Sequence, residues 1–320
     1  MGKKEMGIGS KIVYWILLGL CKFVGLLPTW FLYHCLLDAI YFFVYKVCRY
    51  RVRIVRENLE LAFPEKNAAE RRGIEKRFYY HLAEVMVDTI DFMSITPAQA
   101  RKRLVIDGFE EHERSVDGGN WIAALAHYGS WEYFAAYPLF TQSATASAYH
   151  PLHNKAVDRL MLESRSRFGM QLVPMYDLGR FVARHKDAAE GNYALGMIID
   201  QSPSRRSAYV WVRFLGQPTR FFTGVEKFAI KYNLKVYFFH MEKPARARYH
   251  GHFEMIYDGR EQVGEGEIVS RYARRLEEQV RARPELWMWS HRRWKRPASE
   301  EIREKMDAGA GIVASETKNR

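Results

Sequence analysis

Cysteine is scarce in this 320-residue sequence, and its three copies, Cys21, Cys35 and Cys48, all lie in the first fifty residues. They form no Cys-x-x-Cys pair and lack the spacing of metal ligands. The sequence therefore argues against a disulfide framework and against a structural zinc site. Because the three thiols lie in apolar stretches, we expect them to act as small apolar side chains in a reducing compartment.

Long uninterrupted apolar runs are also missing. A membrane-spanning helix needs about 20 apolar residues. Residues 12–27 are broken by Lys22, and residues 30–45 are broken by His34 and Asp38. A cleaved signal peptide is not indicated either, because no small-residue cleavage site follows these runs.

Basic residues flank the two apolar runs on both sides. Those before the runs are Lys3, Lys4 and Lys11, and those after them are Lys46, Arg49, Arg51 and Arg53. Such flanks, together with the Trp, Tyr and Phe within the runs, favour a helical hairpin or an interfacial anchor whose ends face the cytoplasm. We expect residues 1–49 to form hydrophobic membrane-anchoring helices; a pair of core helices is the alternative.

Acidic residues are few relative to basic ones. The chain has 49 Lys and Arg against 37 Asp and Glu, which gives a net charge of +12, and residues 201–300 hold 20 Lys and Arg against 11 Asp and Glu. This surplus would attract anionic lipid, a phosphorylated glycolipid, an acidic carrier protein or nucleic acid. No helix-turn-helix or base-stacking sheet motif is present, so we expect no nucleic-acid partner.

Short apolar segments alternate with amphipathic ones beyond residue 90. We expect strands at 121–126, 145–149, 171–175, 193–199, 209–214, 235–240 and 253–256, and helices at about 131–139, 154–167, 177–190, 223–232 and 265–282. This alternation predicts an α/β fold with a largely parallel sheet flanked by helices, as one domain over residues 50–300. Residues 301–320 are small and polar and predict a disordered tail.

The six residues 127–132, with the sequence HYGSWE, follow the apolar strand expected at 121–126. In open α/β sheets ligands bind at the carboxyl ends of strands, so His127 lies at such an end by its position alone. Gly129 permits a tight turn, and Ser130 could cap the helix that follows.

A turn of this kind would bring Glu132, in the first turn of the helix, back toward His127. A carboxylate beside an imidazole fixes its tautomer and raises its basicity, so the other ring nitrogen could take a proton from a hydroxyl nucleophile. The alternative is a histidine at a strand end that hydrogen-bonds to backbone.

The spacing H-x-x-x-x-E at a strand end resembles the signature of the glycerolipid and lysophospholipid acyltransferase superfamily. Further segments in the same order resemble a bacterial branch, the late or secondary acyltransferases of lipid A biosynthesis. They are residues 50–53 (YRVR), 57–59 (ENL), 63–64 (FP), 165–169 (RSRFG), 200–201 (DQ), 214–216 (FLG) and 289–295 (WSHRRWK). The resemblance covers roughly residues 10–297, and these pieces in order make it far more specific than H-x-x-x-x-E alone.

The resemblance implies a membrane-associated enzyme with a glycerolipid acyltransferase-like αβα sandwich. Such an enzyme would transfer a fatty acyl group from an acyl-carrier-protein or CoA thioester to a hydroxyl of a lipid A precursor, at the cytoplasmic face of the bacterial inner membrane. It would use no metal, no cofactor and no covalent acyl-enzyme. His127 would be the general base, oriented by Glu132, and backbone amides after Gly129, from Ser130 on, would stabilise the oxyanion.

Three further residues would line the site by the same resemblance: Arg165, Arg167 and Asp200. One arginine would bind a phosphate or the oxyanion, with Asp200 as its orienting partner or as a second polar wall. Read without the resemblance, the arginines fit a solvated helix face and the aspartate fits a turn. Gln201 stands where many relatives have a histidine, which leaves the detail of the acceptor open.

The basic segment near the C-terminus is interleaved with tryptophan. It contains Arg292, Arg293, Lys295 and Arg296, beside Trp287, Trp289 and Trp294. We expect Arg292 and Arg293 to bind substrate phosphates while the rings lie among acyl chains. The alternative is that both arginines are structural and pin this segment to the domain through buried carboxylates.

Two other functions stay open. The same chemistry could act on another acceptor, a lysophospholipid or an amino-acid lipid. A non-catalytic protein could instead use the basic surface to bind anionic lipid, and it would not need His127.

Overall fold

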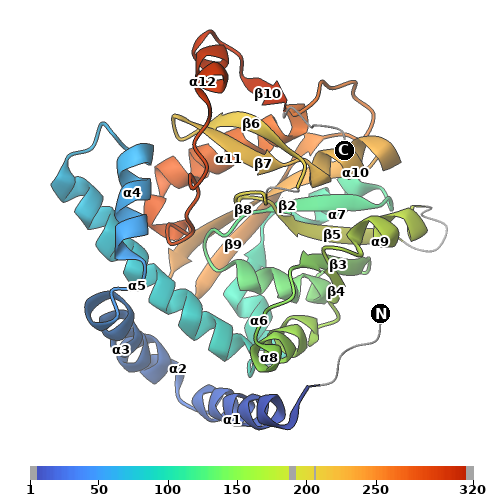
Figure 1. Cartoon of the computed structure of the whole chain (residues 1–320). Coiled ribbons are helices and arrows are strands. Elements are labelled where there is room, and N and C mark those ends of the chain that lie inside the picture. Colours follow the sequence, from blue (N-terminus) through green and yellow to red (C-terminus); the bar gives the residue numbers. More distant parts are fainter. Residues whose placement is uncertain (1–5, 187–191, 205–206, 315–320) are drawn as a thin grey trace.

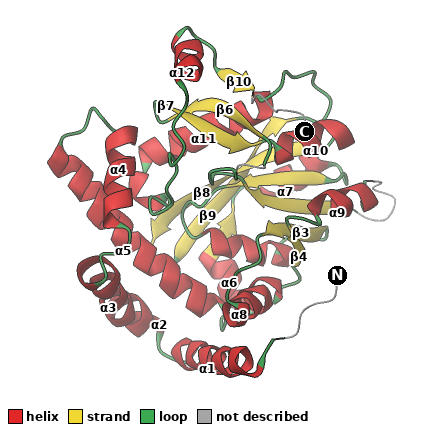
Figure 2. Cartoon of the chain, in the orientation of Figure 1, coloured by secondary structure: helices red, strands yellow, loops and turns green. Residues whose placement is uncertain are grey.

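A computed structural model describes residues 6–186, 192–204 and 207–314 (Figure 1). Lys3, Lys4, the end of the helix expected at 177–190 and residues 315–320 lie outside these ranges. The described residues form a mixed α/β fold whose main sheet is flanked by helices, which confirms the predicted fold class (Figure 2).

The main sheet has seven strands in the order β1-β9-β8-β2-β5-β3-β4. Their bounds are β1 Leu104–Ile106, β2 Trp121–Leu125, β3 Ala144–Tyr149, β4 Gln171–Pro174, β5 Tyr193–Ile198, β8 Lys235–Ala245 and β9 Arg248–Tyr257. Strands β8, β2, β5, β3 and β4 run parallel, whereas β9 is antiparallel to β8. The carboxyl ends of these parallel strands therefore share one edge of the sheet.

The centre of this sheet is shielded from water. Every residue of β2 is at most 3% exposed, and the ring of Trp121 packs edge-to-face on Tyr137 and Tyr237. Apolar side chains at every position, rather than at alternate ones, are typical of a parallel strand that is covered on both faces. The segment that begins at Ala126 thus leaves the sheet from a dry, rigid support.

The helices expected from the sequence begin within two residues of their predicted starts, and further helices precede the first strand. They are α4 Val52–Ala62, α5 Ala68–Phe92, α6 Pro97–Arg103, α7 Phe109–Val116, the 3-10 helix η3 Trp131–Leu139, α8 Lys155–Ser166, α9 Leu178–Arg184, α10 Gly224–Tyr232, α11 Glu267–Ala282 and the short 3-10 helix η5 Pro284–Leu286. The longest, α5, starts at a capping box in which Asn67 and Glu70 bond each other's backbone N–H groups.

A separate antiparallel sheet has the order β10-β6-β7, with β6 Tyr209–Phe214, β7 Gln217–Phe222 and β10 Ile312–Ala314. The strand expected at 209–214 belongs here and not to the main sheet. The disordered tail expected over 301–320 is also corrected as far as Ala314. The hydroxyl of Ser299 caps α12 (Glu300–Asp307), and β10 then pairs with β6.

The N-terminal segment forms α1 (Ile8–Gly25) and a second apolar helix, Thr29–Val47, made of α2 (Thr29–Phe31), η1 (Leu32–Leu36), α3 (Leu37–Tyr41) and η2 (Phe42–Val47). By length and composition both helices could cross a membrane. In the structure they lie along the outside of the domain, α1 against α8 and α3 against α5 (Figure 1). Large apolar side chains on their outer faces stay exposed, among them Trp15, Phe23, Trp30, Phe42 and Phe43.

Candidate active site

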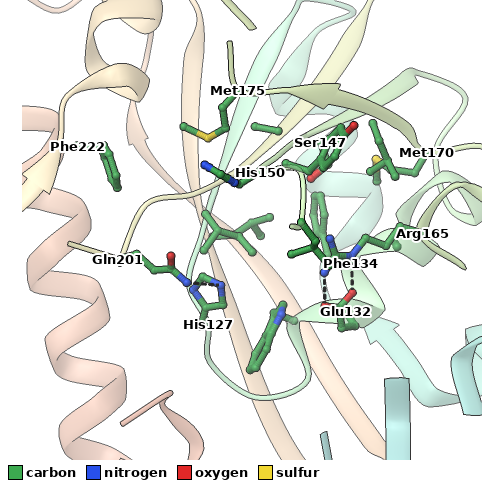
Figure 3. Close-up of a pocket in the computed structure, with 18 residues that line it drawn as sticks. His127, Glu132, Phe134, Ser147, His150, Arg165, Met170, Met175, Gln201 and Phe222 are labelled. Atoms are coloured by element: carbon green, nitrogen blue, oxygen red, sulfur yellow. Dashed lines mark hydrogen bonds and ion pairs between the residues drawn. The ribbon is translucent and has the colours of Figure 1, made fainter. Parts of the chain in front are cut away.

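His127 lies just beyond the end of β2, as its sequence position predicted. Its backbone N–H donates to Asp200 Oδ2 at 2.9 Å, and its Nδ1 lies 2.7 Å from Asp200 Oδ1. A carboxylate can only accept a hydrogen bond here, so Nδ1 carries the proton and Nε2 has the lone pair. That lone pair accepts from the side-chain amide of Gln201 at 3.2 Å, which Figure 3 shows beside the ring.

Asp200 follows β5, the strand next to β2 in the sheet. It is 3% exposed, and its Oδ2 also accepts a bond of 2.9 Å from the indole N–H of Trp287. Burial by itself would raise the pKa of this carboxyl, but the imidazole of His127 and the N–H donors outweigh burial and lower the pKa below its usual value. Asp200 therefore stays ionised and holds one tautomer of His127.

Glu132 has a different partner from the one expected. Its two oxygens accept a bidentate pair from Arg165, at 2.8 Å from Nε and 2.6 Å from Nη2 (Figure 3). The carboxylate on the imidazole of His127 is thus Asp200 and not Glu132. Glu132 lies in the first turn of η3, a 3-10 helix rather than an α-helix, and its side chain meets the end of α8, where Arg165 lies.

The turn between His127 and η3 is fixed by its contacts with other segments of the chain. Gly129 has a φ of +59°, the left-handed region, and a Cβ there would lie 2.6 Å from Met241 Sδ, so the glycine predicted for a tight turn is required. Its N–H donates to the carbonyl of Leu286, and its carbonyl lies 3.2 Å from His81 Nε2. Ser130 is fully buried at the position before η3, but its hydroxyl does not cap the helix as expected.

A cavity of about 440 Å³ opens in front of His127 at the carboxyl ends of β2, β3, β4 and β5. Most of its lining residues are apolar, and Figure 3 shows the polar ones among them. The apolar lining residues include Leu125, Trp131, Phe134, Leu152, Met170, Leu172, Met175, Ile198 and Phe222, and the polar or charged ones are His127, Glu132, Ser147, Tyr149, His150, Arg165 and Gln201. An apolar pocket with a small number of convergent polar groups is typical of a ligand site, and this one fits an aliphatic chain whose reactive end meets an imidazole.

Comparison with protein families gives a match that spans nearly the whole chain. The family of bacterial lipid A biosynthesis acyltransferases matches residues 2–296. This chain belongs to that family. The match confirms the resemblance found in the sequence and supports an acyltransferase that acts on a lipid A-like substrate. No curated protein sequence matches the chain.

Two of the arginines expected in the site of this lipid A acyltransferase family member lie elsewhere. Arg167, just past the end of α8, donates to the carbonyl of Phe92 and stacks on Phe168, so it does not line the cavity. Arg293 is 3% exposed: it donates to the carbonyl of Arg220 at 2.6 Å and to Ser202 Oγ at 3.3 Å.

Burial lowers the pKa of Arg293 to about 10, and its guanidinium lies 4.4 Å from the ring of Phe221. It is therefore a structural residue, although its partners are a carbonyl and a hydroxyl and not the carboxylates considered from the sequence. Arg292 does point outward, with a side chain that is 53% exposed and 3.6 Å from Glu57. The expectation of two substrate-binding arginines in this segment is thus reduced to one exposed side chain.

The sequence did not predict the contacts that three further residues make in the site: Trp287, Gln201 and His81. Trp287 reaches Asp200 and Gln201 reaches His127 only because distant segments meet at one edge of the sheet, whereas His81 reaches Gly129 from α5. Within the described ranges, no group of three or more His, Cys, Asp or Glu residues is placed to hold a metal ion.

Proposed function

We propose that this chain is a membrane-associated O-acyltransferase that moves a fatty acyl group from an acyl-carrier-protein or CoA thioester to a hydroxyl of a lipid A precursor. The observation that carries the proposal is the pair His127 and Asp200 at the mouth of an apolar cavity. Nε2 of His127, the ring nitrogen opposite the aspartate, is hydrogen-bonded to Gln201, and both residues line the cavity. Family membership supplies the reaction class.

In the proposed reaction His127 Nε2 takes the proton of the acceptor hydroxyl while the hydroxyl oxygen attacks the thioester carbonyl. The tetrahedral intermediate collapses, the C–S bond breaks, and the imidazolium returns its proton to the sulfur. Asp200 stabilises the imidazolium that forms between these steps, because it is ionised and bonded to Nδ1. Gln201 leaves Nε2 when the hydroxyl binds.

The oxyanion of the intermediate needs hydrogen-bond donors. The N–H of Gly129 is already bonded to Leu286, so we assign this role to the amides at the start of η3, at Trp131 and Glu132, which line the cavity. The first N–H groups of a helix have no partner within it and bind anions readily. Arg165 adds a positive charge nearby, and Glu132 fixes its position through the bidentate pair.

The apolar cavity is the proposed site of the acyl chain. Its lining includes the flexible thioether side chains of Met170 and Met175, together with Leu172. Removal of an aliphatic chain from water stabilises the complex by roughly 0.8 kcal/mol per buried methylene group. A chain bound there would direct its carbonyl toward His127.

The donor and the acceptor both carry negative charge, and the basic surplus of residues 201–300 would attract them. We assign this steering to exposed cations such as Arg292, and no longer to Arg293. Exposed charges are screened beyond about 8 Å at physiological ionic strength, so the Michaelis constants should rise with salt while turnover changes little.

Membrane attachment is proposed for the two N-terminal helices, at the cytoplasmic face of the inner membrane. The inner face of α1 bonds the domain: Tyr14 donates to Glu163 at 2.5 Å, and Arg159 lies over the ring of Tyr14. Charged groups at such a contact are costly inside the bilayer, so we propose that α1 lies in the interface rather than across the membrane. Replacing the exposed rings of Trp15, Trp30 and Phe42 by serine should move the protein from the membrane to the soluble fraction.

A panel of acceptors tests the proposed substrate. Purified protein is incubated with an acyl-carrier-protein thioester and, separately, with a lipid A precursor, a lysophospholipid and an amino-acid lipid, and the products are identified by mass. One added acyl chain on the lipid A precursor supports the proposal. Transfer only to another lipid would keep the chemistry and change the acceptor, and no transfer to any lipid would favour a non-catalytic binding protein.

A further inference from the structure

A second cavity, of about 330 Å³, lies behind the catalytic turn. It is bounded by α3, α5, the end of β8 and η5, and it shares no lining residue with the cavity in front of His127. Two of its lining residues, His81 and Leu286, are the partners of the carbonyl and the N–H of Gly129. A ligand in this cavity would therefore lie one residue away from the catalytic turn.

The cavity carries an excess of positive charge. Four cationic side chains line it: Lys76, Arg77, Lys243 and Arg283. Glu285 is the one acidic residue in the lining. Glu285 accepts from Arg283 at 2.8 Å and lies 3.9 Å from Arg77, while Lys243 pairs with the buried Glu84. Among the described residues, none forms an ion pair or hydrogen bond with the side chain of Lys76.

Burial and the neighbouring Lys243 lower the pKa of His81 to about 3, so the imidazole adds no charge of its own. The exposed cations Lys76 and Arg77 are therefore poorly compensated, on a concave surface where the potential of like charges adds. Such a site attracts a group with at least one full negative charge, and phosphate fits the fork of an arginine and the point charge of a lysine.

Two tyrosines, Tyr41 and Tyr80, belong to the lining of the same cavity. The two residues after Tyr41 in the apolar helix, Phe42 and Phe43, have 60% and 57% of their surface exposed. Cations beside exposed aromatic rings are typical of surfaces that meet a bilayer, where the rings lie among acyl chains and the cations at the level of the phosphates.

We propose that this cavity binds the phosphate of an anionic membrane phospholipid, with Lys76 and Arg77 as its main contacts. The bound headgroup would hold α5 and the catalytic turn at the level of the membrane surface. The inference rests on the membrane attachment in the proposed function and is independent of acyl transfer.

Vesicle sedimentation tests the site with the full-length protein. The probes are phosphatidylcholine vesicles and phosphatidylcholine vesicles with added phosphatidylglycerol. The double variant K76Q/R77Q removes two charges from the cavity. Juxtamembrane cations contribute roughly five-fold each to binding of anionic lipid, so the variant should bind phosphatidylglycerol vesicles about 30-fold more weakly and phosphatidylcholine vesicles as before.

The matched control is K227Q/K231Q on α10, which loses the same charge from two exposed lysines on the other side of the fold (Figure 1). Its affinity for phosphatidylglycerol vesicles should change by less than about three-fold. Equal losses in the two variants would mean that only net charge matters, and no loss in K76Q/R77Q would mean that the cavity binds no lipid phosphate; either result overturns the site.

Two further measurements distinguish lipid phosphate from free phosphate, and the proposed site from the membrane attachment on which it rests. Inorganic phosphate should not release wild-type protein from phosphatidylglycerol vesicles; complete release at millimolar concentration would identify a free-phosphate site and overturn the lipid assignment. Wild-type protein that binds neither vesicle would instead refute the membrane attachment on which the inference rests. Acyl transfer is measured separately with detergent-solubilised substrates, so its failure leaves this result unaffected.

Discussion

Replacing Asp200 by asparagine changes one atom and tests the arrangement around His127. The carboxylate accepts three bonds, two from His127 and one from Trp287. An amide has a single acceptor oxygen. If that oxygen accepts from the backbone N–H of His127 and from the indole of Trp287, the amide nitrogen faces Nδ1. Because the amide nitrogen can only donate, the imidazole proton moves to Nε2, the nitrogen that must act as the base.

The D200N variant should therefore lose turnover on the order of 10²–10⁴-fold, because both the tautomer and the charge that stabilises the imidazolium are lost. Loss of a bond to a buried charged group should also lower the free energy of unfolding by roughly 1.5–3 kcal/mol. Substrate affinity should change less than turnover, since the aspartate lies behind the ring and not in the cavity.

The assay follows release of the carrier thiol at saturating lipid acceptor, with the melting temperature measured on the same preparations. Glu132→Gln is the matched control: it removes the charge that holds Arg165 and leaves the bonds of His127 in place, so it should be milder than D200N. Near-wild-type turnover of D200N would show that Asp200 does not set the tautomer of His127. A Glu132 variant more impaired than D200N, at unchanged melting temperature, would return the orienting role to the glutamate.

Further variants separate structural from functional residues. Arg293→Gln should lower the free energy of unfolding by about 2–4 kcal/mol and the melting temperature with it, whereas Arg292→Gln should leave the melting temperature unchanged and raise the Michaelis constant only at low salt. Burial lowers the pKa of His112 from 6.5 to about 4, so the unfolded chain binds one more proton in that range and stability falls as pH drops from about 6.5 to about 4. Between pH 7.5 and pH 5 this linkage amounts to about 2 kcal/mol, which His112→Phe should remove, as read from melting temperatures at the two pH values; an unchanged difference between the two pH values would contradict the assignment. His81→Gln can keep the donor to Gly129, while His81→Phe cannot, so only the phenylalanine variant should lose turnover, on the order of 10- to 100-fold at an unchanged Michaelis constant; equal turnover in the two would show that His81 does not position the turn.

Local pattern in the sequence was sufficient for much of the fold. The continuous apolar run at 121–126 predicted β2, because a strand buried on both faces has no polar side. Gly129 predicted the turn, since its positive φ excludes other side chains at low cost. Both features depend on residues that are close together in the sequence, so the sequence alone was enough to predict them.

The orienting carboxylate could not be assigned in the same way. Asp200 meets His127 because β5 lies beside β2, and the order of strands in a sheet depends on contacts far apart in the sequence. Glu132 lay at the expected spacing, but the helix after the turn is a 3-10 helix, and its side chain is bonded to Arg165 on another helix.

The sequence also could not predict which charged residues are buried. Arg293 and Arg292 are neighbours in one basic segment, yet the first is buried beneath β7 and the second is exposed. The tail also had no strong apolar pattern, and it is ordered as far as Ala314 by pairing of β10 with β6, which is about one hundred residues away in the chain.

The role of His127 as the general base is tested by the rate at which His127→Ala transfers an acyl group from a carrier-protein thioester to the lipid A precursor, with the product quantified by mass. The imidazole is part of the cavity wall and its removal leaves the buried strand β2 intact. We expect a folded protein with the wild-type melting temperature within a few degrees and a rate lower on the order of 10²–10⁴-fold. A variant that forms the acylated lipid at the wild-type rate would contradict this role of His127.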